Sequence, residues 1–276
     1  MERQIMTRIS SQAEAAAATG IDRHHPQNLV ELKNIDKVYP NGTVAVERAN
    51  LDIAENEFFC FVGPSGCGKS TIFNMITGLT EHTGGELSVL GTESKEARKE
   101  NEIAFVFQEP TLLPWNNLLE NVSLPLKLRK VPKKQRHEEG ERVLELVGLK
   151  DYTKSLPSQL SGGMKMRVSI ARALISRPKL LLMDEPFGAL DEFTRQSLQD
   201  ELLRIWSQDQ RMTVLFITHN VFEAVYLSSQ VVVMTPSPGR ISDVIQIDEP
   251  FPRGENFRVA PSFSQYVQSV TSSLEH

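Results

Sequence analysis

The chain has 276 residues, 40% of them hydrophobic, which is enough for one large α/β domain with an inserted subdomain. Its formal net charge of -5 argues against a broad electrostatic contact with nucleic acid. The sequence has no signal-peptide pattern and no run near the ~20 apolar residues of a membrane span, so we expect any work at a membrane to go through a partner. Its two cysteines, Cys60 and Cys67, suggest no disulfide framework and suit a reducing compartment.

The first part of the chain predicts a tail followed by an antiparallel β subdomain. We expect residues 1–27 to be a mobile tail and residues 28–276 to form one domain. Apolar alternation predicts strands from Leu29 to Val38 and from Val44 to Ile53, which are joined by a turn. A further short strand is expected from Glu86 to Gly91.

A glycine-rich segment matches the phosphate-loop pattern of a Gly, four residues and then Gly-Lys-Ser. Its residues are Gly63, Pro64, Ser65, Gly66, Cys67, Gly68, Lys69, Ser70 and Thr71. The glycines let the backbone N–H groups turn inward, which makes a nest for phosphate oxygens at the positive end of the following helix. Lys69 is expected to reach the β and γ oxygens of a triphosphate, and Ser70 to hold Mg²⁺. The alternative, a simple Gly-rich turn, is disfavoured because Phe58 to Val62 predicts a strand before the loop and helical spacing follows it.

Continuous apolar runs predict a sheet that is buried on both faces, as in parallel α/β proteins. These runs are Ile103 to Phe107, Leu180 to Met183, Val214 to Ile217 and Val231 to Met234. Between the first two runs, helical patterning extends from Lys133 to Val147 and from Ser161 to Arg177. We therefore expect an inserted helical subdomain at about residues 112 to 177.

Two acids, Asp184 and Glu185, end one of the buried strands, where sites in parallel sheets commonly open. In phosphate-loop enzymes the first acid at such a position orders Mg²⁺. Glu185 is then free to accept a proton from the attacking water or to orient it. The alternative is a solvated strand end, which a neighbouring phosphate loop makes a poor explanation.

The segment Leu160-Ser161-Gly162-Gly163-Met164 opens a second helix with a polar cap and two glycines. Several N–H donors at a positive helix end predict a second phosphate-binding site. An ordinary Ser-capped helix is the alternative. Because one chain need not close both sites on one nucleotide, we expect the glycines of one copy to face the loop of another.

Together these motifs resemble the nucleotide-binding subunit of an ABC transporter, and the resemblance covers residues 39 to about 241. Gly63 to Thr71 resembles the family's Walker A motif, Leu160 to Met164 its signature and Leu180 to Glu185 its Walker B motif. The resemblance implies an ABC-type ATPase core with a mostly parallel sheet, an N-terminal antiparallel β subdomain and a helical insert. It also implies ATP and Mg²⁺ as cofactors.

Four residues gain a specific role from this resemblance. Tyr39, which alone could be a buried ring with a wet hydroxyl or could stack on a base, resembles the base-stacking aromatic. Asp191 belongs to a segment that resembles the D-loop. Gln108 resembles the Q-loop glutamine, which senses Mg²⁺ and the lytic water and touches the membrane partner, and His219 resembles the switch histidine at the γ-phosphate. Alone, Gln108 and His219 would be solvated residues at strand ends.

The resemblance implies that two subunits bind two ATP molecules head to tail and that the closed pair drives a permease. Glu185 would be the catalytic base, while Lys69 and His219 would stabilise the γ-phosphate. Ser161 and Gly163 would complete the opposite site. The implied magnesium ligands are Ser70, Gln108 and Asp184.

Three segments narrow the resemblance to importers of nitrate, sulfonates, taurine and bicarbonate: Leu112 to Trp115, Glu120 to Val122 and Ser237 to Ile241. Trp115 could equally pack at a subdomain joint. Asn220 departs from the family, which usually has an acid after the histidine. After Ile241 we expect only a short tail, too small for a separate regulatory domain.

The favoured hypothesis is an importer ATPase, peripheral on the cytoplasmic face of the cell inner membrane. Its expected partners are permease subunits, a second ATPase subunit (itself or a paralogue) and, indirectly, a solute-binding protein, with no nucleic acid. A soluble relative that acts in DNA repair or on ribosomes would be expected to carry two cassettes, a long coiled coil or basic arms, and none is visible. An inactive partner in a heteromeric pair is disfavoured by the presence of Glu185 and His219.

Overall fold

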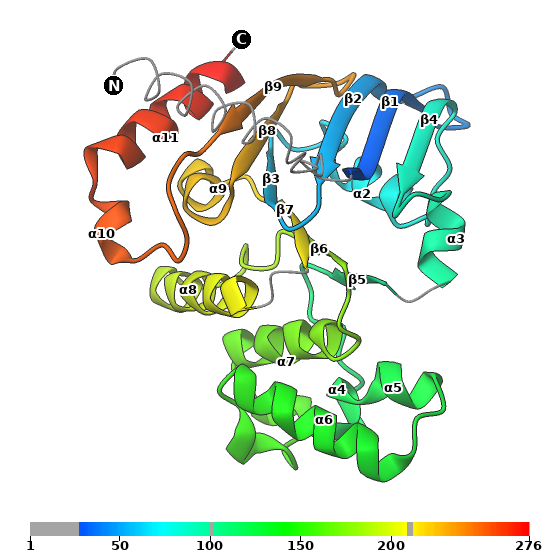
Figure 1. Cartoon of the computed structure of the whole chain (residues 1–276), viewed down its shortest axis with the longest axis vertical. Coiled ribbons are helices and arrows are strands. Elements are labelled where there is room, and N and C mark those ends of the chain that lie inside the picture. Colours follow the sequence, from blue (N-terminus) through cyan, green and yellow to red (C-terminus); the bar gives the residue numbers. More distant parts are fainter. Residues whose placement is uncertain (1–27, 100–101, 209–211, 276) are drawn as a thin grey trace, which may run out of the picture.

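The computed structural model describes residues 28–99, 102–208 and 212–275, and within them the chain forms two sheets with helices around them (Figure 1). A three-stranded antiparallel sheet, in the order β2-β1-β4, is made of β1 (Asn28–Val38), β2 (Val44–Ala54) and β4 (Gly84–Val89). A six-stranded sheet, in the order β5-β6-β7-β3-β8-β9, is made of β3 (Phe58–Val62), β5 (Ile103–Val106), β6 (Leu180–Asp184), β7 (Thr213–Ile217), β8 (Gln230–Met234) and β9 (Ile241–Gln246). The expected mobile tail, residues 1–27, lies outside the described residues.

The helices fall into three groups along the chain. Next to the antiparallel sheet are α2 (Lys69–Ile76) and α3 (Ser94–Lys99). Between β5 and β6 lie α4 (Leu118–Val122), α5 (Leu124–Leu128), α6 (Lys133–Leu146), the 3-10 helices η1 (Lys150–Tyr152) and η2 (Pro157–Gln159), and α7 (Gly162–Leu174). The remaining helices are α8 (Glu192–Gln208), α9 (Val221–Leu227), α10 (Glu255–Arg258) and α11 (Pro261–Leu274).

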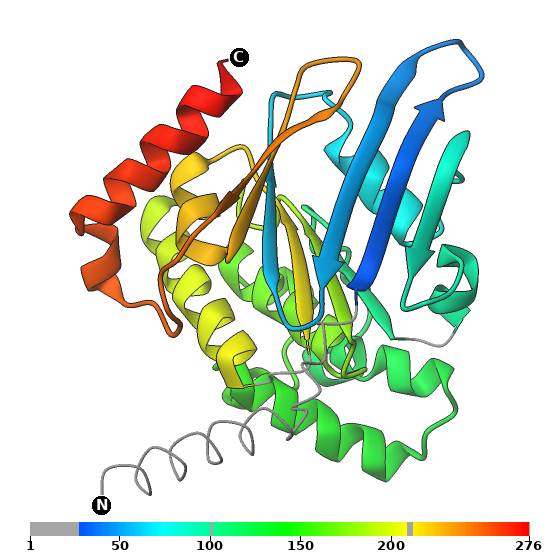
Figure 2. The same cartoon turned by 45° about the horizontal axis from the view of Figure 1, so that its top comes forward.

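The main sheet is buried on both faces because successive side chains of each central strand enter different cores. In β3, Phe58 and Cys60 pack among the helices α7, α8 and α9, whereas Phe59 and Phe61 pack against α2 and the antiparallel sheet. Figure 2 shows this division, with the antiparallel strands (blue to cyan) and α11 (red) on opposite sides of the main sheet. The alternation explains why the sequence of β3 is continuously apolar.

Five strands of the main sheet, β5, β6, β7, β3 and β8, run parallel, and only β9 is antiparallel to its neighbour. The carboxyl ends of the parallel strands therefore share one edge of the sheet. The predicted α/β fold, with a mostly parallel sheet, an antiparallel N-terminal sheet and a helical insert between β5 and β6, is confirmed.

Two expectations about the elements need correction. The run from Ile103 is only half-buried, because β5 is the edge strand of the sheet and has one neighbour. The helix that begins after Ser161 ends at Leu174 rather than at Arg177. Arg177 lies directly before Pro178, where the right-handed helical region is sterically disfavoured, and its φ of 50° is outside that region.

The segment after Ile241 is not a simple tail. It forms β9, which pairs with β8, and then α10 and α11, whose buried side chains Phe257, Phe263 and Val270 belong to the core shared with α9. Within the described residues, no helix has the combination of length and apolar character that crossing a bilayer requires.

Candidate active site

The phosphate loop joins β3 to α2, and its geometry depends on a left-handed glycine. Gly68, the residue before the first turn of α2, has φ of 97°. A Cβ at this position would meet the carbonyl oxygen of Ala45 at 2.6 Å, so both the backbone conformation and the lack of space exclude a side chain. The loop therefore turns tightly into the positive end of α2, which suits phosphate.

Lys69 places its ammonium group inside this loop. The side chain is 6% exposed, and its Nζ donates to the carbonyl oxygens of Gly63 at 2.7 Å and Pro64 at 3.0 Å. The cation therefore lies within the phosphate loop.

Asp184 is the last residue of β6 and lies beside Ser70. Burial raises the pKa of its carboxyl group, which the hydrogen bond from the Ser70 hydroxyl and the charge of Lys69 partly offset. Within the described residues, no group of three or more His, Cys, Asp and Glu side chains could hold a metal ion on its own. A hydroxyl and one carboxylate nevertheless fit Mg²⁺, which is usually bound by one or two carboxylates, water and substrate phosphates.

Glu185 and His219 meet at the ends of two neighbouring strands. Asp184 pairs in register with Ile217, so the residues that follow β6 and β7 lie side by side. The carboxylate Oε2 of Glu185 lies 3.1 Å from Nδ1 of His219. Glu185 is 25% exposed and His219 is 63% exposed, so both are accessible to a substrate.

Gln108 lies at the same edge of the sheet, beyond the end of β5. A Cβ on Gly188 would meet Nε2 of Gln108 at 3.4 Å and Oε2 of Glu185 at 3.8 Å, which shows that both side chains border Gly188. The strand order β5-β6-β7-β3 therefore brings together Gln108, the acid pair, His219 and the phosphate loop, as the sequence predicted.

Tyr39 follows β1 and approaches the first turn of α2. It is half-buried, its hydroxyl oxygen lies 3.3 Å from Oγ1 of Thr71, and Nζ of Lys37 lies 5.1 Å from its ring centroid. An aromatic ring beside the phosphate loop is compatible with stacking on a base.

A separate group of predicted site residues consists of Ser161, Gly162, Gly163 and Asp191. Ser161 caps α7 by accepting a hydrogen bond from the Met164 N–H at 3.3 Å. Asp191 accepts bonds from the N–H and hydroxyl of Thr194 at 3.0 and 2.7 Å, and these bonds lower the pKa of its carboxyl group. Figures 1 and 2 both show α7 on a different part of the molecule from α2, so one chain does not bring its signature to its own phosphate loop.

The role of Asn220 was not predicted from the sequence. Its Oδ1 accepts hydrogen bonds from the N–H groups of Phe222 and Glu223 at 3.0 and 3.3 Å, so Asn220 caps α9 directly after His219. An Asn followed three residues later by Glu is a recognised helix-start pattern, which could have revealed this role.

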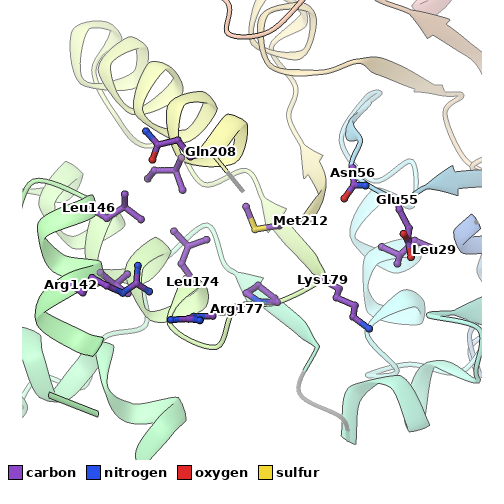
Figure 3. Close-up of a pocket in the computed structure, with 13 residues that line it drawn as sticks. Leu29, Glu55, Asn56, Arg142, Leu146, Leu174, Arg177, Lys179, Gln208 and Met212 are labelled. Carbon is purple, nitrogen blue, oxygen red and sulfur yellow. The ribbon is translucent and has the colours of Figure 1, made fainter. Parts of the chain in front are cut away.

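A cavity of about 800 Å³ lies elsewhere, between the helical insert and the amino ends of the parallel strands (Figure 3). Its lining includes Asn56 before β3, Lys179 before β6 and Met212 before β7. None of the residues expected to bind nucleotide lines it. The candidate active site is therefore the opposite, carboxyl edge of the sheet.

Comparisons with known proteins show the family of the chain. Residues 46–188 match the family model for ABC transporters. A putative ATP-binding protein of Brucella abortus (strain 2308) is 46% identical over 247 residues, which cover 90% of this chain and 94% of the relative. The aliphatic sulfonates import ATP-binding protein SsuB of Bacillus cereus is 40% identical over 251 residues, which cover 90% of this chain and 96% of the relative.

Two solved structures have the same fold. The ATP-binding cassette MJ0796, a dimer in a post-hydrolysis state bound to ADP and Pi, has a TM-score of 0.71 and 31% identity and covers 80% of this chain and 100% of its own. The protein cbiO1 from Clostridium perfringens, part of the ABC transporter complex cbiONQ, has a TM-score of 0.73 and 25% identity and covers 84% of this chain and 93% of its own. The chain therefore belongs to the ABC transporter family. Within that family it is an ATP-binding subunit, an ATPase coupled to transport.

Proposed function

We propose that this ATPase powers an importer that takes up a small anion through a membrane permease. The observation that carries the proposal is the convergence of the phosphate loop, Glu185, Gln108 and His219 at four neighbouring strand ends. The importer class and the anion are supported by the similarity to SsuB. Nitrate, sulfonates, taurine and bicarbonate are the candidate solutes.

The side chains divide the chemistry between them. Lys69 and the N–H groups of the loop would hold the β and γ phosphates, and Tyr39 would stack on the base. The Mg²⁺ ion would be held by Ser70, Asp184 and Gln108. When it is bound, it neutralises part of the phosphate charge. Glu185 would accept a proton from the attacking water or orient it, and His219 would contact the γ-phosphate and keep the carboxylate in place.

Closure of the site needs a second ATPase subunit, which is either another copy of this chain or a paralogue. Ser161, Gly162 and Gly163 would bind the γ-phosphate held by the partner, with Asp191 at the same interface. The exposed positions of Ser161 and Gly162 support this proposal. So does the dimeric state of MJ0796 bound to ADP and Pi.

The permease is proposed to dock near Gln108 and Trp115, on the cytoplasmic face of the inner membrane. Trp115 is 74% exposed and Phe107 is 45% exposed, so apolar surface is available next to the glutamine. A solute-binding protein would act indirectly, by delivering the anion to the permease. No contact with nucleic acid is part of the proposal.

The test is to copurify the chain with its permease, reconstitute the complex in vesicles and measure ATP turnover with nitrate, taurine, an alkanesulfonate or bicarbonate. We expect one of these anions to raise turnover several-fold, and a complex that carries Glu185→Gln to show no such rise. Absence of any polytopic membrane partner, together with salt-sensitive retention on nucleic acid, would contradict the proposal.

A further inference from the structure

The loop between β8 and β9, Thr235–Arg240, lies directly against the outer side of the phosphate loop. Ser237 donates a hydrogen bond from its hydroxyl to the carbonyl oxygen of Gly66 at 3.1 Å, across 171 residues of sequence. A Cβ on Gly239 would lie 1.9 Å from the carbonyl oxygen of Cys67, so the two backbones touch. No side chain fits between them.

The same loop also pairs with the beginning of β2. The N–H of Gly239 donates to the carbonyl oxygen of Ala45 at 3.2 Å, and the carbonyl oxygen of Gly239 accepts from the N–H of Glu47 at 2.9 Å. The guanidinium group of Arg240 adds bonds to the Glu47 carboxylate at 2.6 and 3.1 Å. Tyr39 is bonded through its N–H to the carbonyl oxygen of Thr43, the residue before β2.

The two ends of this loop are bonded to each other. The N–H of Thr235 donates to the carbonyl oxygen of Arg240 at 3.0 Å, and the N–H of Arg240 donates to Oγ1 of Thr235 at 3.1 Å. The loop therefore lies between two parts of the site. On one side it contacts the phosphate loop, and on the other it bonds to β2, the strand that follows the turn with Tyr39.

We infer that Ser237 and Gly239 are positioning residues, which hold the phosphate loop from its outer side and so set the positions of its phosphate-binding groups. The inference rests on the proposed role of the loop in binding ATP. Since each peptide unit is planar, holding the carbonyl group of Cys67 outward also directs the N–H of Gly68 to the other side, toward the phosphates. The bond from Ser237 to the Gly66 carbonyl oxygen fixes the preceding peptide unit, whose N–H, on Cys67, donates to the carbonyl oxygen of Pro64 at 3.3 Å. Neither Ser237 nor Gly239 touches the nucleotide in this scheme.

The experiment compares binding of ADP and of inorganic tripolyphosphate by calorimetry. Gly239→Ala must displace Cys67, so we expect at least tenfold weaker binding of both ligands. Ser237→Ala removes one hydrogen bond and should weaken both about threefold, whereas Ser237→Thr keeps the hydroxyl and should bind as the parent protein does. Tyr39→Ala should weaken only ADP, because tripolyphosphate has no base.

Gly254→Ala is the matched control, since Gly254 has no neighbour within 4 Å of an added Cβ and no left-handed φ. It should leave both affinities unchanged, although Ala is a poorer N-cap than Gly for the short helix α10. Unaltered binding by Gly239→Ala and Ser237→Ala would overturn the inference. It would also be overturned if Gly239→Ala lowered only the melting temperature, or weakened ADP but not tripolyphosphate. Failure of the parent protein to bind ADP would instead contradict the proposed function.

Discussion

At the scale of single residues, the conformation of Glu185 is the most informative feature of the site. Its φ is 44°, in the left-handed region that non-glycine residues rarely occupy, at a cost on the order of 1–3 kcal/mol. The surroundings hold this conformation: the N–H of Glu185 donates to the carbonyl oxygen of Ile217, and its carboxylate bonds to His219. Strain of this kind at the end of β6 turns the side chain toward Gln108 and His219, which supports a direct part in catalysis.

Replacement of Glu185 by Gln removes the proton acceptor but keeps the size of the side chain. We expect ATP hydrolysis to fall at least 100-fold, the lower range of a general-base contribution, with ATP affinity changed less than threefold. The variant should also accumulate as an ATP-bound dimer, which size-exclusion chromatography would detect. Glu138→Gln, at an exposed position on α6, is the control and should leave hydrolysis unchanged. Hydrolysis at the parent rate in Glu185→Gln would remove Glu185 from the catalytic role.

At the scale of elements, the carboxyl-terminal segment is attached to the core by a buried cation. Arg253 is 6% exposed, and its guanidinium carbon lies 4.1 Å from the ring centroid of Phe251. Burial lowers the pKa of Arg253 to about 10, with no carboxylate among its hydrogen-bond acceptors in the described part of the chain. Its guanidinium group donates to the carbonyl oxygens of Val225, Tyr226, Ser228, Ile247 and Glu249. The segment after β9 is therefore part of the structure that supports α9, the helix that begins directly after His219 and Asn220.

A buried acid also joins α9 to α8. Glu223 is 5% exposed, and its carboxyl group accepts a hydrogen bond from Nε2 of Gln199 at 2.9 Å. Burial raises the pKa of Glu223, with hydrogen bonds from Thr218 and Gln199 acting in the opposite direction. Within the described residues, the amide oxygen Oε1 of Gln199 has no hydrogen-bond partner.

The folded protein keeps the proton of the Glu223 carboxyl group to a higher pH than the unfolded chain does, because its pKa is raised. The contribution of Glu223 to stability therefore falls as pH rises above the ordinary pKa of 4.5 and through the raised value. Glu223→Gln removes this dependence and supplies a donor for Gln199. We expect the free energy of unfolding of the variant, relative to the parent, to increase with pH and to be about 1 kcal/mol greater at pH 8.

Urea unfolding of both proteins between pH 5 and pH 8 measures this difference. The exposed Glu141→Gln on α6 controls for loss of a negative charge and should give a difference that does not change with pH. A Glu223→Gln difference that is constant or decreases with pH would show that the carboxyl group is ionised without penalty in the folded protein.

At the scale of the whole molecule, the two predicted phosphate-binding motifs, the phosphate loop before α2 and the signature at the start of α7, pack against different elements. The start of α7 packs against the first turn of α8 and the residues just before it. A Cβ on Gly162 would meet Leu190 at 3.6 Å, and a Cβ on Gly163 would meet Thr194 at 2.6 Å. The phosphate loop instead packs against β2 and the β8–β9 loop. We therefore expect a site that uses both motifs to be shared between two copies.

Mixing two inactive variants tests this sharing. Lys69→Ala would inactivate the phosphate loop. Gly162→Asp would place a negative charge at the signature, and the space around Gly162 accommodates a side chain without disturbing the chain itself. In a head-to-tail pair of the two variants, one site carries both lesions and the other carries neither.

We expect each variant alone to be inactive and the mixture to recover up to about a quarter of the parent ATPase activity, because about half of the dimers are mixed and each has one intact site. A Lys69→Ala chain that also carries Gly162→Asp is the control and should restore nothing when it is mixed with either single variant. If the mixture of single variants stays inactive while both bind as dimers, each site lies within one chain.

Much of the site could be predicted because its chemistry is local in sequence. The phosphate loop needs its glycines and Lys69 within nine residues, and the boundaries of β3 and α2 follow from the apolar patterns on either side. The acid pair was placed correctly for the same reason, since a continuous apolar run ends at Asp184. Gln108 and His219 carried no local signal of their own and were predicted only by resemblance.

What the sequence by itself determined was the identity of most strands, the glycine-rich loop between β3 and α2, the cap at Ser161 and the α/β class, because each depends on residues that are close along the chain. Only the tertiary structure decided the order of the strands, the partial exposure of β5, the attachment of the carboxyl-terminal helices and the contact of Ser237 and Gly239 with the phosphate loop. These features depend on backbones that meet across long stretches of sequence, and no periodicity or spacing along the chain encodes which surfaces will touch.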